Sequence, residues 1–406
     1  MPTDRPDVSA DASPAPRWAR RGTWTWWRIN IALFLSGYAI FSQIYCVQPL
    51  LPDLARAFGV SAAESSLALS LSTGFLAVSI LIAGALSEAL GRKRLMLVSL
   101  IVAAILELAV AVAPSWSMIL VLRALEGFAL GGAPAVAMAY LAEEIDPAGL
   151  GSAMGLYIGG NAAGGMAGRV VTGFVAEHAD WRVALAVIGA LGLAAAVGFA
   201  ALLPPSRNFT PRPSRGLRPH LAAWGRHLGD PGLIALFAVA FLAMGGFVTV
   251  YNYVGFRLMA PPWDLGQGAV GSIFLVYVFG IVASPVAGGL ADRFGRAPVL
   301  AGGVLVTAAG LAVTLLPALP AVVIGIALVT SGFFAAHTVA GGWVGARANG
   351  DKAHASSLYL LAYYLGSSIA GSTGGLAWTH AGWPGVAAFV AVLLAGQMVL
   401  AVRLRD

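Results

Sequence analysis

Four charged side chains lie deep inside long apolar stretches of this sequence, and they are the residues best placed to do chemistry. They are Glu107, Arg123, Glu126 and Arg169, and all four fall in the first half of the chain. A lone charge at the centre of a lipid bilayer costs on the order of 3 kcal/mol, so acids and bases there are expected to pair. A buried carboxylate can also bind and release a proton as its surroundings change. The residues alone leave both interpretations open.

The depth of these charges follows from their distance to the ends of their segments. At about 1.5 Å per residue, Glu107, Arg123 and Arg169 each lie roughly 10 Å below the outer surface, with Glu126 slightly deeper. Arg123 and Glu126 are three positions apart, which places them on one face of a helix. We therefore expect two acids and two bases at similar depth to neutralise one another.

Long apolar segments must position these charges. Hydrophobic residues make up 59% of the chain and charged residues only 10%, which is far from the balance of a soluble protein. A membrane-spanning helix needs about 20 apolar residues, and spanning strands would need an alternation that the sequence lacks. The sequence therefore predicts an all-α membrane protein with twelve transmembrane helices. Their expected ranges are 29–50, 64–87, 95–113, 117–142, 150–175, 182–203, 231–256, 268–290, 298–316, 320–345, 354–378 and 384–402.

The net charge of +6 reflects membrane orientation and does not indicate nucleic-acid binding. Most of the 24 basic residues fall at the ends of segments that would face the cytoplasm, whereas the opposite face holds only Arg56, Arg182 and Arg257. Since cytoplasmic loops of membrane proteins are enriched in Lys and Arg, both termini are predicted to be cytoplasmic. The single cysteine, Cys46, excludes an intramolecular disulfide and a cysteine-based metal site, and no cofactor is expected.

A short charged motif occurs twice, at equivalent places in the two halves. The copies run from Gly84 to Arg94 and from Gly288 to Arg296, with a constant offset of 204 residues, about half the chain. A repeat at half-length spacing predicts two related halves. The residues common to the motif are Gly84, Glu88, Gly91 and Arg92 in the first copy and Gly288, Asp292, Gly295 and Arg296 in the second.

This duplicated pattern, G-x-L-a-D-r-x-G-r, resembles the motif that members of the major facilitator superfamily carry between transmembrane helices 2 and 3. The resemblance implies two six-helix bundles related by a pseudo-twofold axis, with the motif charges latching the cytoplasmic side. It also implies that Glu143 or Glu144 approaches Arg92, and that Arg92 and Asp292 are needed for transport. The expected divisions are a cytoplasmic N-terminal segment (1–28), two bundles (29–203 and 231–406) and a cytoplasmic linker (204–230).

Two further segments resemble proton-coupled drug exporters within this superfamily. Arg123-Ala-Leu-Glu-Gly127 is similar to their signature R-x-x-x-G, and the antiporter signature matches at Gly160, Gly164 and Gly168. It departs at Gly165 and Arg169, and small residues at this spacing are also typical of close helix packing. The overall pattern is similar to the YnfM-like branch of sugar and drug exporters.

The halves match a second time, at an offset of 202 residues, where 156–181 is similar to 358–383. In this alignment Arg169 corresponds to Gly371. The halves thus share architecture but not charge, and ion coupling is expected in the first half. Glu126 is the predicted proton carrier, and replacing Glu107 is expected to matter less because the resemblance puts segment 95–113 outside the cavity.

The resemblance also places the first, fourth, seventh and tenth helices around a central cavity. Polar and aromatic residues there suit a pocket for a small amphipathic or polyhydroxylated molecule. The predicted substrate-binding residues are Tyr38, Gln43, Tyr45, Asn161, Tyr251, Asn252, Phe334, His337 and Tyr363.

We therefore expect a secondary active transporter in the inner membrane, monomeric, with protons, membrane lipids and a small-molecule substrate as partners. Export by proton antiport is the preferred direction. Proton-coupled import and ion-independent facilitation remain alternatives. An enzyme is disfavoured because the sequence lacks H-E-x-x-H, G-x-S-x-G and a P-loop.

Overall fold

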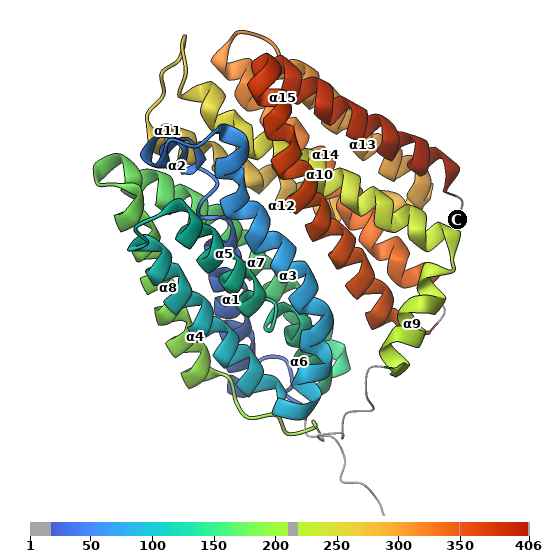
Figure 1. Ribbon diagram of the computed structural model, residues 1–406. Coiled ribbons are helices and arrows are strands. Elements are labelled where there is room, and N and C mark those ends of the chain that lie inside the picture. Colours follow the sequence, from blue (N-terminus) through green and yellow to red (C-terminus); the bar gives the residue numbers. More distant parts are fainter. Residues whose placement is uncertain (1–17, 210–217, 349, 405–406) are drawn as a thin grey trace, which may run out of the picture.

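The structure is a computed structural model that describes residues 18–209, 218–348 and 350–404 (Figure 1). Parts of the expected N-terminal segment and linker, residues 1–17 and 210–217, lie outside this range. In chain order the helices are α1 (Trp24–Tyr45), α2 (Leu51–Phe58), α3 (Ala62–Leu90), α4 (Arg92–Ala111), α5 (Trp116–Leu130), α6 (Pro134–Glu144), α7 (Pro147–His178), α8 (Trp181–Leu202), α9 (Arg218–Leu228), α10 (Pro231–Leu258), α11 (Gln267–Ser272), the 3₁₀ helix η1 (Ile273–Val276), α12 (Tyr277–Phe294), α13 (Arg296–Val313), α14 (Leu319–Arg347) and α15 (Lys352–Arg403).

The predicted all-α membrane architecture is confirmed. Within the described ranges, eight helices or runs of helices are long and apolar enough to cross a membrane. One of them, α15, is broken at Ala381 and Gly382, where the backbone leaves helical geometry, so it contains both of the last two predicted spans. The remaining predicted spans overlap with α1, with α5 followed by α6, and with α7. The first of them, 29–50, extends beyond the end of α1 at Tyr45 into the turn that precedes α2.

Two predicted helices are interrupted in the structure. The segment 117–142 divides into α5 and α6, because Pro134 has no N–H to continue the helical ladder and the turn before it contains Gly131 and Gly132. The segment 268–290 begins as α11, passes through η1 and continues as α12. The first interruption brings Gly131 against Ser79 of α3, where an added β-carbon would lie 2.5 Å from the serine.

Glycines let helices within each half approach closely. An added β-carbon at Gly160, Gly164 or Gly168 would lie 2.2–2.6 Å from backbone atoms of α1, which no side chain could tolerate without movement. In the second half, an added β-carbon at Gly366 would lie 2.1 Å from the Phe241 carbonyl oxygen of α10. Gly366 lies 202 positions after Gly164, so the repeat seen in the sequence is also a repeat of helix contacts.

The duplicated motif has the same backbone geometry in both halves. Gly91 separates α3 from α4 with φ +86° and ψ 145°, and Gly295 separates α12 from α13 with φ +88° and ψ 158°. These angles are accessible only to glycine at low cost. The motif glycines therefore make the sharp turn between consecutive helices.

The two halves meet mainly along α3 against α15 and along α7 against α11. Ser368 donates a hydrogen bond to the Ser70 carbonyl at 2.6 Å, and Gly173 packs directly on Gly271. Ser70 lies in the first third of α3, which follows α2, and Gly271 lies in α11. Figure 1 shows α2 and α11 at the same end of the molecule, which we call the α2–α11 end. The opposite end, which carries α6 and α9, is called the α6–α9 end.

The linker is anchored to both halves on either side of the undescribed residues. Before them, the Tyr140 hydroxyl donates to the carbonyl of Pro204; after them, Trp224 of α9 donates to Ser357 of α15. Asp230 caps α10 and accepts from Arg347 at 3.0 Å. Partial burial works to raise the pKa of Asp230, but hydrogen bonds from Arg347 and from backbone N–H groups outweigh it and lower the pKa.

Candidate functional site

Arg123 of α5 is the centre of a fully buried ionic cluster in the first half. Its Nη1 contacts Glu107 of α4 at 2.9 Å and Glu126 at 2.7 Å, and all three side chains have no solvent exposure. The same guanidinium donates to the carbonyls of Gln43, Ile44 and Ala68. These bonds orient Arg123 across α1, α3 and α4, so three helices fix the position of one cation.

The cluster holds more acid than base. Two carboxyl groups share one guanidinium, so the cluster would carry a net negative charge if both carboxyl groups were ionised. Glu107 Oε1 accepts from the Cys46 thiol at 3.0 Å, whereas Glu126 Oε1 has no hydrogen-bond partner among the described residues. An uncompensated charge at such burial is strongly unfavourable, and one added proton would balance it.

Arg169 does not join this cluster, contrary to the expected neutralisation of two acids by two bases. Its Nε donates to Gln48 at 2.7 Å and its Nη1 donates to the carbonyl of Gly165. The glycine stripe of α7 packs on α1, and this turns Arg169 toward the second half while Arg123 stays within the first. Arg123 and Arg169 were expected at similar depth in the membrane, but depth does not determine toward which neighbouring helices a side chain points.

Aromatic rings cover the Arg169 guanidinium. Its carbon lies 4.2 Å from the ring centre of Tyr45 in the first half, and 5.0 Å and 4.8 Å from those of Phe274 and Tyr277 in the second. Such cation–π contacts contribute about 0.5–2 kcal/mol each, more when desolvated. Arg169 is therefore held by both halves at once.

A chain of polar contacts continues from Arg169 into the second half. Gln48, which accepts from Arg169, donates to Asn252 of α10 at 2.8 Å, and Asn252 donates to the Gly371 carbonyl of α15 at 3.3 Å. The chain thus joins α7, the turn after α1, α10 and α15. Gly371 is the residue that the internal repeat places opposite Arg169.

The second half contributes an aromatic cluster beside Arg169, which we define as Phe247, Tyr251, Phe274, Tyr277, Phe333 and Phe334. Phe247 stacks on Phe333 with ring centres 3.9 Å apart, and Tyr277 lies 5.8 Å from Phe334. His337 and Tyr363, whose ring centres are 4.7 Å apart, extend the cluster.

Most of the predicted substrate-binding residues gather around this cluster, and three lie elsewhere. Tyr45, Tyr251, Asn252, Phe334, His337 and Tyr363 lie in or beside it. The Asn161 side chain instead lies in the packing between α1 and α7, and Gln43 packs against Gly192 of α8. The backbone of Tyr38 packs on Gly164 of α7, and Tyr38 is half-buried.

Sequence reasoning missed Phe274 and Tyr277 as partners of Arg169. The sequence shows that both are aromatic residues in an apolar segment. It does not show which aromatic rings of the second half face the first half. Within the described part of the chain, no group of three or more His, Cys, Asp and Glu residues is arranged to hold a metal ion.

The charged motif of the first half makes the contact that the sequence predicted. Arg92 donates to Glu143 of α6 through Nη2 at 2.8 Å and Nε at 3.3 Å, and its guanidinium lies 4.7 Å from the ring centre of Phe209. Glu144 instead accepts from the backbone N–H groups of Arg207 and Asn208. The approach of an acid to Arg92 is therefore confirmed, with Glu143 as the partner.

The other motif residues lie nearby or at the equivalent turn of the second half. Gly84 and Glu88 are in the last turns of α3, and Glu88 is half-buried. Gly288 and Asp292 are in α12, and the Asp292 side chain is exposed. Arg296 begins α13 immediately after Gly295.

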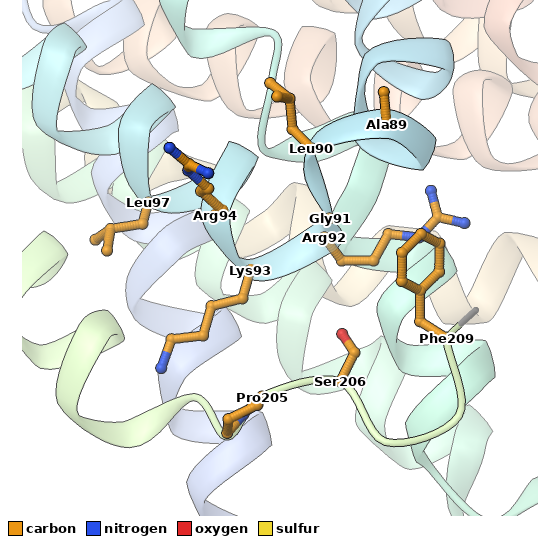
Figure 2. A pocket seen from close by; sticks show the side chains of 10 residues that line it. All are labelled: Ala89, Leu90, Gly91, Arg92, Lys93, Arg94, Leu97, Pro205, Ser206 and Phe209. Carbon is orange, nitrogen blue, oxygen red and sulfur yellow. The ribbon is translucent and has the colours of Figure 1, made fainter. Parts of the chain in front are cut away.

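A surface pocket of about 530 Å³ lies beside the first motif (Figure 2). It is lined by Ala89, Leu90, Gly91, Arg92, Lys93, Arg94, Leu97, Pro205, Ser206 and Phe209. Figure 2 shows Arg92 reaching toward Phe209 of the linker, with Lys93 directed to the other side. All of these residues belong to the first half or the linker, so the pocket is separate from the contact between the halves.

Comparisons with known proteins agree with this architecture. The family model described as "Major Facilitator Superfamily" matches residues 30–274 and 258–406. The chain belongs to this superfamily. It is 46% identical over 387 residues to "Inner membrane transport protein YnfM" of Escherichia coli (strain K12), covering 95% of this chain and 92% of that protein. It is 43% identical over 393 residues to "Uncharacterized MFS-type transporter YybF" of Bacillus subtilis (strain 168), covering 95% and 97%.

A solved structure shares the fold at low sequence identity. The peptide transporter POT in complex with sulfate superimposes with a TM-score of 0.76 at 13% identity, covering 95% of each chain. The superfamily fold and the long apolar helices make this protein a multi-pass membrane transporter of the major facilitator type.

Proposed function

We propose that the protein is a proton-coupled exporter of small organic molecules that works by alternating access as a monomer. The observation that carries this proposal is the cluster of Arg123 with Glu107 and Glu126, buried without solvent exposure. One proton on the pair of carboxyl groups makes the cluster neutral. Release of that proton requires water or a new positive partner, and a change of conformation supplies either.

Glu126 is the proposed carrier because one of its oxygens is free of hydrogen bonds among the described residues. Glu107 is additionally held by the Cys46 thiol, which fixes it as the counter-charge of Arg123. Desolvation favours the neutral carboxyl group and the nearby guanidinium favours the charged one. A conformational change that alters the balance of these two effects would bind a proton on one side of the membrane and release it on the other.

Alternating access is supported by the way in which the two halves touch. Their contacts include small residues such as Gly173 and Gly271, together with single hydrogen bonds such as Ser368 to Ser70, and such surfaces can separate at modest cost. At the α6–α9 end, the Arg92–Glu143 pair ties α4 to α6 within the first half. We propose that these motif charges, with Asp292 in the second copy, stabilise the state in which the α6–α9 end is shut.

The orientation is proposed from the distribution of basic residues. Arg28, Arg92, Arg347 and Arg403 all lie at the helix ends that meet at the α6–α9 end. Because Lys and Arg are enriched on the cytoplasmic side of membrane proteins, this distribution supports a cytoplasmic location for this end and for both termini. The membrane is then the inner membrane of the cell. Lipid headgroups are proposed partners of the exposed basic residues there.

The test is transport by the purified protein in lipid vesicles with an imposed pH difference. Vesicles containing the pH-sensitive dye pyranine are exposed to a panel of sugars, aromatic cations and aromatic carboxylates. Coupled export predicts that a transported compound moves protons in the opposite direction, and that reversing the pH difference reverses the flux. A flux that is the same with and without the pH difference would exclude proton coupling, and movement of both in one direction would make the protein an importer.

A further inference from the structure

Arg169 is a buried cation without an anionic partner among the described residues. It is only 2% exposed, and no carboxylate of the described residues contacts it. Nε and Nη1 each donate one hydrogen bond, whereas Nη2 donates none to any described residue. A guanidinium has five N–H donors in a planar fork that fits a carboxylate with two parallel bonds. The side chain therefore retains unused capacity for an anion.

The contrast with Arg123 sharpens this observation. Arg123 has two carboxylate partners and three backbone carbonyl acceptors at the same degree of burial. The rings around Arg169 offset part of the cost of its burial but supply no counter-charge. One negative charge placed next to Nη2 would complete the site electrostatically.

The position of Arg169 makes it available to a transported molecule. Two of its three rings, Phe274 and Tyr277, belong to the second half, and so does the Asn252 end of its polar chain. Separation of the halves at the α2–α11 end would remove these partners together. The guanidinium would then face the space between the halves, where a ligand travels.

The surroundings also indicate the body of the ligand. Phe274 and Tyr277 continue directly into the rest of the aromatic cluster, where Tyr277 lies 5.8 Å from Phe334 and Phe334 lies 5.4 Å from Phe333. Flat rings in such a cluster favour offset or edge-to-face contacts with another aromatic ring. The cation at one edge and the rings beyond it are arranged for a molecule with an anionic head and a flat apolar body.

We infer that the protein binds an aromatic carboxylate, whose carboxylate is received by Arg169 and whose ring packs against Phe274, Tyr277 and Phe334. The inference adds a substrate class to the proposed function. It rests on the proposed function in one respect, that the space between the halves is the transport path. It excludes aromatic cations from this position, since Arg169 would repel them.

The first test compares two ligands of the same shape on the unmodified protein. Binding of 4-hydroxybenzoate and of its neutral analogue 4-hydroxybenzamide is measured by calorimetry on detergent-solubilised protein at pH 7.5, with acetate as the anion that lacks a ring. We expect 4-hydroxybenzoate to bind at least about tenfold more tightly than either, because charge-assisted hydrogen bonds are roughly twice as strong as neutral ones. Equal binding of acid and amide, or no binding of the acid, overturns the inference.

The second test assigns the anion to Arg169. Arg169→Gln should weaken 4-hydroxybenzoate binding about tenfold or more while leaving the amide unchanged, and Arg169→Lys should restore part of the affinity. Arg257→Gln is the matched control, because Arg257 also stacks on two rings, Trp263 and Trp383, yet lies within the second half. Unchanged binding to folded Arg169→Gln protein overturns the assignment.

The outcomes separate this inference from the proposed function. Binding of 4-hydroxybenzoate without any response of its flux to pH would leave the inference intact and refute proton coupling. Proton-driven flux of neutral or cationic compounds, with no binding of 4-hydroxybenzoate, would support proton coupling and refute the inference. The comparison of acid and amide needs no variant, so a folding defect in Arg169→Gln does not prevent a decision.

Discussion

Replacement of Glu126 by Gln should abolish proton-driven transport while preserving the fold. Glutamine keeps an oxygen that can accept from Arg123 Nη1, now 2.7 Å from Glu126, and Arg123 keeps its pair with Glu107 at 2.9 Å. The variant cluster then has one positive and one negative charge, which is the charge of the protonated wild-type cluster. Substrate should therefore still bind, but no proton can be released.

The size of the effect follows from the driving force. A pH difference of one unit is worth about 1.4 kcal/mol per proton, which corresponds to roughly a tenfold concentration gradient of substrate for each coupled proton. Wild-type protein should approach that gradient in sealed vesicles, and Glu126→Gln should accumulate none. Exchange of labelled for unlabelled substrate, which needs no net proton movement, should survive in the variant.

Glu107→Gln is the matched control for this experiment. Glu107 is bound to the same guanidinium and is equally buried, but it also accepts from Cys46, so its replacement should reduce the driven gradient less. Retention of the full tenfold gradient by Glu126→Gln would refute its role as carrier. Loss of the gradient in Glu107→Gln alone would transfer the role to Glu107, and retention in both would leave the cluster a purely structural ion pair.

Three further predictions concern the motif, the orientation and the helix packing. Arg92→Ala and Glu143→Ala should each slow transport severalfold while leaving membrane insertion normal. The double variant should be no slower than either single variant, because each single substitution already removes the same 2.8 Å ion pair. Additive losses of transport rate in vesicles would contradict this prediction. Ala179→Cys should react with a membrane-impermeant maleimide from outside intact cells, against a low background because the native cysteine is buried; labelling only after lysis would reverse the orientation. Gly164→Leu should prevent stable folding or lower the melting temperature by several degrees, because its β-carbon would lie 2.2 Å from a carbonyl oxygen of α1, whereas Gly159→Leu, with nothing within 4 Å, should melt as wild type does.

Much of the architecture could be predicted because the relevant information is local or repeated. Apolar length identifies a membrane span, since the bilayer has a fixed thickness. The offset between the two motif copies identified the two halves, and the glycines of those copies were later found in the same positive-φ geometry. Arg123 and Glu126 share a face because they are one helical turn apart, and this contact follows from helix geometry alone.

The tertiary structure alone decided how those faces combine. Depth along the helices suggested that Arg169 would meet Glu107 and Glu126, but the rotation of α7 depends on its glycine stripe packing against α1, and this directs Arg169 to the second half. Its partners there, Phe274 and Tyr277, lie more than a hundred positions after Arg169 in the sequence. A sequence specifies which residues share a helix face, whereas the packing of many helices determines what each face meets.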